Sequence, residues 1–194
     1  MAQTAERKRR FFAGIALSDV CRCACARVAD ELRATGFAAR YEAPEKLHVT
    51  LAFLGFVEAA RADGLAKILA AAADRARPFS LVIDKLGAFP HERNARVVYL
   101  GAREQGTPFR RLAADVRSAY AAAGFEFAQD PVAHVTIARA KDSRRSLPPV
   151  GVSPIALDVA EIALFESLPD PARKTSRYEV VATTALGTTV WERR

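Results

Sequence analysis

The tripeptide His-Val-Thr occurs twice in this chain and contains two of its three histidines. The copies begin at His48 and His134, and each lies in a short apolar run of the kind that forms a buried strand. Side chains alternate between the two faces of a strand, so the His and Thr of each copy share one face and the Val lies on the other. Each strand can therefore be anchored in a core while it presents an imidazole and a hydroxyl to a shared cleft.

Capping residues, glycines and prolines divide the rest of the chain into helices and strands. The pattern predicts helices at residues 19–34, 58–77 and 107–123. It predicts strands at residues 11–17, 47–55, 79–89, 96–100, 125–127, 132–138, 155–165 and 178–186. We expect residues 79–89 and 96–100 to pair as a hairpin, because turn-forming residues lie between them.

The order of these elements favours an α+β fold. Strands follow one another in pairs too often for a doubly wound parallel sheet, so we expect mostly antiparallel sheets. Each half of the chain has an early helix and one His-Val-Thr strand, which predicts two pseudo-symmetric α/β lobes around a central groove. We see no linker between the halves, and we expect a disordered basic tail at residues 1–8 followed by a single two-lobed domain at residues 9–194.

The composition limits the class of protein. The chain has 194 residues, of which 51% are hydrophobic, and this is enough for one substantial core. The net charge of +7 favours a polyanionic partner such as RNA or a phosphorylated metabolite, although a generic basic surface gives the same count.

The N-terminal segment has two competing interpretations. Basic residues 7–10 followed by apolar residues 11–17 imitate a signal peptide. A first strand that ends at a helix cap explains the same residues, and the apolar run is far shorter than the ~18 residues that span a membrane. We therefore expect a cytoplasmic protein with no membrane segment.

The three cysteines form one local cluster. Cys21, Cys23 and Cys25 are an odd number and form no disulfide framework. On a helix, neighbours two apart point in different directions, and no second Cys or His cluster offers the missing ligands of a metal site. Free cytosolic thiols fit this pattern better than a zinc or redox site.

Two opposed histidines suit phosphoryl transfer. An imidazole titrates near neutral pH, so one histidine can accept a proton from the attacking oxygen while its partner gives a proton to the departing oxygen. In-line transfer places those two oxygens on opposite sides of phosphorus. The threonine hydroxyls can hold the non-bridging oxygens, and this arrangement requires no metal.

Longer segments around both motifs carry a family resemblance. Residues 46–55 read Lys-Leu-His-Val-Thr-Leu-Ala-Phe-Leu-Gly, and residues 133–139 read Ala-His-Val-Thr-Ile-Ala-Arg. The pair resembles the two-histidine (2H) phosphoesterase superfamily, and within it the RNA 2′,3′-cyclic phosphodiesterases, also called 2′-5′ RNA ligases. The opening strand, the middle hairpin and the closing strands resemble that family too, so the match covers about residues 9–190.

The resemblance implies a reaction and a set of roles. The expected reaction is hydrolysis of RNA 2′,3′-cyclic phosphate ends to 2′-phosphomonoesters, with 2′-5′ ligation as its reverse. His48 is expected to be the proton donor and His134 the proton acceptor. Thr50 and Thr136 are expected to bind the phosphate, and Arg139 the substrate. The resemblance implies no metal or cofactor, a monomer, and RNA ends or small cyclic nucleotides as partners.

Three alternatives remain open at this level. The same chemistry can act on 2′-5′ oligoadenylate or on a cyclic phosphate from ADP-ribose, and a chain of this kind can also be a non-catalytic RNA-binding module.

Phe56 departs from the family pattern, which often has a charged residue after the Leu-Gly of the first motif. His91 lies in a turn-like segment with no Thr two positions on, and we interpret it as an exposed loop residue.

Overall fold

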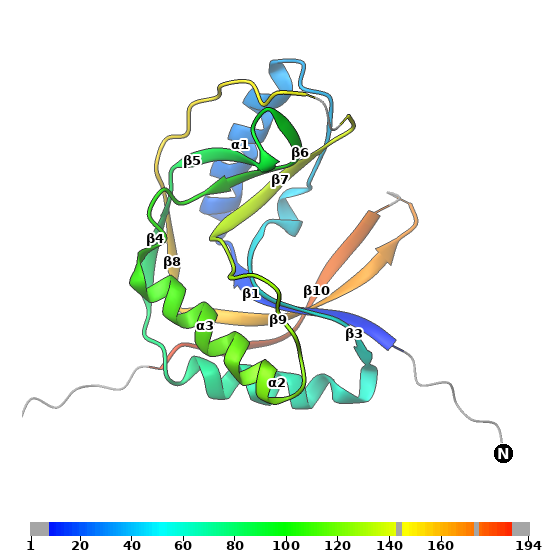
Figure 1. The fold of residues 1–194 in the computed structure, drawn as a ribbon, viewed down its shortest axis with the longest axis vertical. Helices are drawn as coiled ribbons and strands as arrows, with labels where there is room; N and C mark the ends of the chain where they lie inside the picture. Colours follow the sequence, from blue (N-terminus) through cyan, green and yellow to red (C-terminus); the bar gives the residue numbers. More distant parts are fainter. Residues whose placement is uncertain (1–7, 143–144, 173–174, 188–194) are drawn as a thin grey trace, which may run out of the picture.

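The chain folds into two lobes that share one continuous sheet (Figure 1). The computed structural model describes residues 8–142, 145–172 and 175–187. The eight-stranded sheet has the order β10-β9-β1-β3-β7-β6-β5, with β2 paired to β7, and the registered pairs are antiparallel. The predicted α+β fold with two lobes and mostly antiparallel strands is confirmed.

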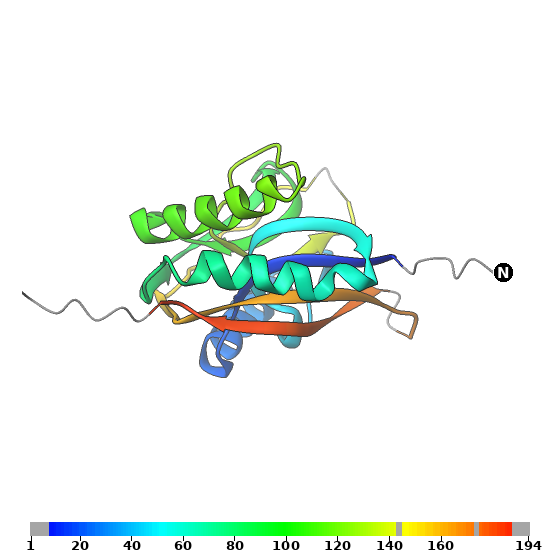
Figure 2. The same ribbon diagram turned by 90° about the horizontal axis from the view of Figure 1, so that it is seen from below.

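The first lobe contains one half of the sheet and two helices. Its strands are β1 (Lys8–Ala16), β3 (His48–Glu58), β9 (Glu161–Asp170) and β10 (Thr175–Ala185). Helix α2 (Ala62–Ala73) packs on β9 and β10, and α3 (Gly106–Ala122) packs on β3 and α2. Figure 2 shows these two helices side by side. Their apolar faces cover one side of this half of the sheet, and the side that points away from α2 and α3 is called the open face.

The second lobe contains the other half of the sheet and one helix. Its strands are β2 (Ala39–Tyr41), β5 (Lys85–His91), β6 (Asn94–Gly101) and β7 (His134–Ala140). Helix α1 (Asp19–Ala34) follows β1 of the first lobe but packs against β7 and β8. Likewise α3 follows β6 of the second lobe but packs on the first. The chain therefore crosses between the lobes in both halves.

Smaller elements join the lobes. Strands β4 (Phe79–Ile83) and β8 (Ile155–Val159) pair with each other and run along one side of the molecule between the lobes (Figure 1). Short 3₁₀ helices span Pro44–Lys46 and Ala59–Arg61. Among the described residues, no helix combines the length and the apolarity needed to cross a membrane.

Several predicted boundaries are wrong. The expected helix 58–77 is shorter, because β3 continues to Glu58 and a 3₁₀ turn precedes α2 at Ala62–Ala73. The expected strand 79–89 is divided at Asp84, whose amide donates to the Gly101 carbonyl, so that β4 pairs with β8 and only β5 forms the hairpin with β6. The expected strand 155–165 is likewise divided between β8 and β9. The short strand β2 was not predicted from the sequence.

The expected edge strand at residues 125–127 is absent from the described structure. The Phe125 amide instead donates to the Tyr120 carbonyl at 3.1 Å and closes the end of α3, with the two rings edge to face. Most of the expected N-terminal tail, residues 1–7, lies outside the described residues, and Lys8 begins β1.

Candidate active site

The two His-Val-Thr strands meet at the middle of the continuous sheet. Val49 of β3 and Val135 of β7 form an antiparallel register pair, and both are fully buried. Continuing this register by one residue in each direction places each histidine across from the other motif's threonine. The His and Thr side chains therefore lie together on the open face, where a groove of about 870 Å³ is lined by His48, Thr50, His134, Thr136 and Arg139.

Both imidazoles are oriented in the same way by the backbone. Nδ1 of His48 donates to the Lys46 carbonyl and Nδ1 of His134 donates to the Val132 carbonyl, each at 2.7 Å. A carbonyl oxygen only accepts, so this bond fixes the proton on Nδ1 and leaves Nε2 for chemistry. Nε2 of His48 accepts from the Thr50 hydroxyl at 3.1 Å.

The surrounding protein holds both imidazoles in the neutral form. Burial lowers the pKa of His48 to about 4, against the bond to the Lys46 carbonyl, which favours the charged form. Nearby His134 lowers the pKa of His48 further. Burial also lowers the pKa of His134, and the Arg139 guanidinium adds to that effect. Burial therefore favours the neutral, proton-accepting form of each histidine, and a negative charge bound nearby would raise either pKa.

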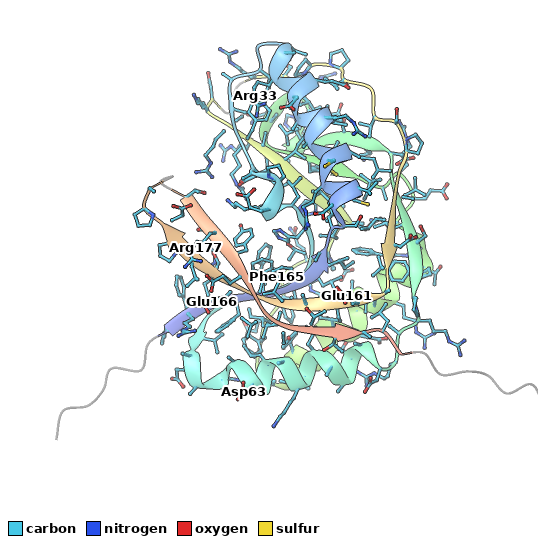
Figure 3. All side chains as sticks on the ribbon, turned by 180° about the vertical axis from the view of Figure 1, so that it is seen from behind. Arg33, Asp63, Glu161, Phe165, Glu166 and Arg177 are labelled. Carbon is cyan, nitrogen blue, oxygen red and sulfur yellow. The ribbon has the colours of Figure 1, made fainter. Side chains whose placement is uncertain are left out.

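Aromatic rings enclose each histidine. Phe12 and Tyr178 lie 4.7 and 5.2 Å from the His48 ring, and Phe12 stacks on Phe165. Phe165 lies on β9 (Figure 3). In the second lobe, Phe89 and Tyr99 lie 5.2 and 5.5 Å from the His134 ring and stack on each other. The rings exclude water from one side of each imidazole, which accounts for the burial that lowers both pKa values.

Two glycines make this packing possible. A Cβ at Gly14 would lie 2.6 Å from the Val49 carbonyl oxygen, so only glycine allows β1 to approach β3 beside the first motif. A Cβ at Gly87 would lie 2.7 Å from the Tyr99 ring. Gly87 therefore leaves the space in which Tyr99 reaches His134.

A bulge follows the threonine in each motif. Tyr99 pairs with Thr136 and Val98 with Ala138, so Ile137 is the extra residue in β7. A bulge reverses the alternation of side chains, and it returns Arg139 to the groove face, where strict alternation would place it in the core. The prediction that Arg139 binds the substrate rested on the family resemblance, and the bulge explains why its side chain faces the groove.

The same bulge occurs in β3. Gly14 pairs with Thr50 and Ala13 with Ala52, so Leu51 is the extra residue. Phe53 therefore occupies in the first lobe the position that Arg139 occupies in the second. Both side chains line the groove, and Phe53 is 60% exposed. The near-repeat His-Val-Thr-Leu-Ala-Phe and His-Val-Thr-Ile-Ala-Arg is the sequence signal for this equivalence.

An ion-pair network that sequence reasoning missed lies beside His48. Glu42 binds the Lys46 ammonium at 2.6 Å and the Arg139 guanidinium at 3.1 Å. Lys46, itself buried, also donates to the Thr175 hydroxyl at 3.2 Å. Burial alone would raise the pKa of Glu42, but the hydrogen bonds and charges of Lys46 and Arg139 lower it. Glu42 therefore stays ionised and connects a groove arginine to the residue whose carbonyl orients His48.

The remaining candidate residues lie away from this groove. His91 is exposed at the end of β5 and does not line the groove. Cys21 and Cys25 are buried on α1 and Cys23 is exposed, with all three thiols unpaired. Among the described residues, no group of three or more His, Cys, Asp or Glu side chains is placed to hold a metal ion.

A two-lobed fold that brings one His-x-Thr motif from each half into a shared groove defines the class of two-histidine phosphoesterases. A profile of the 2′-5′ RNA ligase superfamily matches residues 22–170. The chain therefore belongs to the 2′-5′ RNA ligase superfamily.

Relatives and solved structures agree with this assignment. An Escherichia coli (strain K12) protein named RNA 2′,3′-cyclic phosphodiesterase is 34% identical over 158 residues, which cover 79% of this chain and 85% of that protein. A Geobacillus stearothermophilus protein of the same name is 33% identical over 147 residues, 71% of this chain, but only 45% of that protein is covered.

The structural likeness extends over nearly the whole chain. The crystal structure of Escherichia coli LigT complexed with 3′-AMP has a TM-score of 0.71 at 29% identity and covers 93% of this chain and 99% of that one. A crystal structure from Thermus thermophilus has a TM-score of 0.74 at 25% identity and covers 92% of this chain and 99% of that one. The predicted family and fold are confirmed.

Proposed function

We propose that this chain hydrolyses RNA 2′,3′-cyclic phosphate ends to 2′-phosphomonoesters by paired histidine acid and base catalysis. The observation that carries the proposal is the Val49–Val135 pair, because it sets two His-x-Thr motifs on one face of the sheet in opposite directions. A phosphate between them has an imidazole on each side, as in-line displacement requires. The names of the relatives support the same reaction.

Each atom of the step has a candidate partner in the groove. Nε2 of His134 takes a proton from water as the water oxygen attacks phosphorus. The bond from phosphorus to O3′ breaks, and Nε2 of His48 gives its proton to that oxygen. The hydroxyls of Thr50 and Thr136 donate to non-bridging oxygens, whose charge grows in the transition state. The product keeps the phosphate on O2′.

Neighbouring charges favour this division of roles. Burial is the largest influence on both histidines and lowers both pKa values. At His48 the neighbouring His134 disfavours the charged form, whereas the Glu42 carboxylate favours it by more than the Lys46 ammonium opposes it. At His134 the Arg139 guanidinium disfavours the charged form. An anionic cyclic phosphate in the groove favours the charged form of a neighbouring imidazole, and we propose that His48, beside Glu42, carries the proton as the acid and that His134, beside Arg139, is the base.

The substrate and setting are part of the proposal. Arg139 is proposed to contact the substrate through its guanidinium on the groove face, and RNA ends or small cyclic nucleotides are the proposed ligands. The reverse reaction would join a 5′-hydroxyl to a cyclic phosphate in a 2′-5′ linkage. We also propose a cytoplasmic monomer, and three unpaired thiols support a reducing compartment.

The test is hydrolysis of an RNA oligomer that ends in a 2′,3′-cyclic phosphate, with EDTA present. We expect conversion to the 2′-phosphate by the wild type and its loss in His48→Ala and in His134→Ala. Formation of the 3′-phosphate would overturn the assignment of O3′ as leaving group. Strong inhibition by EDTA would overturn metal-independence. RNA binding without turnover would identify a binding module instead.

A further inference from the structure

Aromatic side chains on the open face of the first lobe continue from the groove toward its edge. In one row across the sheet, Val180 pairs with Phe165, Phe165 with Phe12, and Phe12 with Phe53. Phe12 and Phe165 are buried against His48, whereas Phe53 at the end of the row is exposed. The row therefore runs from the candidate acid to an exposed aromatic ring on β3.

The next row of paired residues, farther from the groove, also ends in an exposed aromatic ring on β3. Tyr178 pairs with Ser167, Ser167 with Arg10, and Arg10 with Phe56. Residues paired across a sheet share a face, so Arg10 and Phe56 point to the same side as the groove. Arg10 lines the groove, and Phe56 lies just outside it with 72% of its surface exposed.

Arg10 and Phe56 together offer a cation and an aromatic face to solvent. Arg10 is exposed and forms no ion pair with a described residue, while its neighbour Arg9 binds Glu166 on the opposite face. Phe56 and Phe53 are both exposed on this face of β3, and exposed apolar side chains that lie close together mark a surface for a ligand or partner. A guanidinium beside an aromatic ring is the combination that holds single-stranded nucleic acid.

We infer that Arg10 and Phe56 form a subsite for the penultimate nucleotide, which precedes the nucleotide that carries the cyclic phosphate. The enzyme would therefore favour RNA chains over mononucleotides. The inference rests on the proposed function. The base stacks on Phe56, and the guanidinium of Arg10 binds the phosphate between the last two nucleotides. The two rows lie about 7 Å apart along β1, which matches the step of one extended nucleotide.

Two observations favour RNA over a protein partner for this surface. The aromatic row is continuous with the candidate active site through Phe12, so a ligand held at phosphorus extends onto it. The net charge of +7 and the position of Arg10 match a polyanion. In the row beyond, Lys8 faces Glu58, which limits the subsite to about one nucleotide.

The experiment compares two substrates with adenine bases, the mononucleotide 2′,3′-cyclic AMP and a dinucleotide that ends in the same cyclic phosphate. The measured quantity is the ratio of their kcat/KM values. We expect the wild type to favour the dinucleotide. Phe56→Ala should lower the ratio about tenfold, since one base stack is lost, and Phe56→Trp should preserve it. The control Val82→Ala removes an exposed apolar side chain on β4, and it should leave the ratio unchanged.

A second measurement tests the proposed role of Arg10. We expect Arg10→Ala to lower the ratio and to reduce the slope of log affinity against log salt concentration by about 0.7 for binding of a single-stranded oligoadenylate with a 2′-phosphate end. Folding of each variant is checked by its melting temperature.

The outcomes separate this inference from the proposed function. An unchanged ratio in Phe56→Ala would overturn the subsite while turnover of the mononucleotide upholds the reaction. If the wild type hydrolyses neither substrate, the proposed function fails, and binding of the 2′-phosphate oligoadenylate alone then decides whether Phe56 contacts RNA. A dimer in the wild type that Phe56→Ala converts to monomer, with RNA binding unchanged, would assign the surface to a second copy.

Discussion

The two halves of the groove have the same backbone but different chemistry. Each lobe supplies a histidine held through Nδ1 by a carbonyl two residues earlier, a threonine, and a bulge directly after that threonine. At the position that the bulge returns to the groove face, the first lobe has Phe53 and the second has Arg139. The backbone orients the two imidazoles in the same way, whereas their neighbouring side chains differ, and the proposed assignment of acid and base rests on that difference.

The difference extends to the charges around each histidine. A carboxylate, Glu42, lies near His48, and a guanidinium, Arg139, lies near His134, although the two groups are bound to each other. One ion pair thus biases both imidazoles in opposite directions. Near-symmetric sites can perform a directional reaction because a small set of side chains breaks the symmetry.

The largest expected effect follows from removing either imidazole. His48→Ala and His134→Ala should each lower kcat by about 10²–10⁴, because each removes one proton transfer. The double variant should lose less than the product of the two single losses, since the pair acts as a unit. Single-turnover kinetics on the cyclic-phosphate oligomer measure both. Near-normal activity in either single variant would contradict the mechanism.

A substrate with a good leaving group separates the two roles. The nitrophenolate of bis(4-nitrophenyl) phosphate departs without a proton, so it needs a base but no acid. We expect His48→Ala to retain most of the wild-type rate on this compound and His134→Ala to lose it, as followed by nitrophenolate absorbance. The reverse pattern would exchange the assigned roles of the two histidines.

A smaller effect is expected from the ion pair that breaks the symmetry. Glu42→Gln removes the charge but keeps the size, and it leaves Lys46 and Arg139 without their anion. We expect kcat to fall about tenfold as the protonated form of His48 loses support, with the alkaline limb of the kcat profile moved to lower pH. An equal fall at all pH values would show that Glu42 only maintains structure.

The lowered pKa of His48 also predicts acid sensitivity. The pKa of His48 is about 4 in the fold against 6.5 when unperturbed, so between these values the unfolded chain binds the additional proton. The contribution to stability is complete above pH 6.5 and is lost as pH falls toward 4, by up to about 3 kcal/mol. Urea denaturation across this range should show a shallower decline in His48→Asn than in the wild type. Parallel declines would argue against the lowered pKa.

The smallest effect is expected at the third histidine. His91 is exposed at the end of β5, outside the groove. His91→Ala should therefore leave kcat/KM and the melting temperature close to the wild-type values, and it serves as the matched control for the two motif variants. A large loss of activity would mean that the substrate extends past Phe89 along the β5–β6 hairpin.

Much of the fold could be predicted because its signals are local. Ser18 caps α1 through its hydroxyl, and glycines end α1 and α3, so the predicted bounds of these two helices were close to the observed ones, whereas those of α2 were four residues too wide at each end. The division of residues 79–89 at Asp84 could not be predicted, because the Gly101 carbonyl that binds its amide is remote in sequence. The aromatic rings around each histidine were also missed, because they come from different strands.

The sequence by itself determined the chemical groups: two histidines and two threonines in alternating strands, with valines between them that belong in a core. Hydrophobic periodicity depends only on residues near one another in the chain, so it can be recognised from the sequence without knowledge of the fold. Only the tertiary structure decided that Val49 meets Val135, that bulges return Phe53 and Arg139 to the groove, and that Glu42 joins Lys46 to Arg139. Those contacts depend on strand register and on charges brought together from distant segments, which no local pattern specifies.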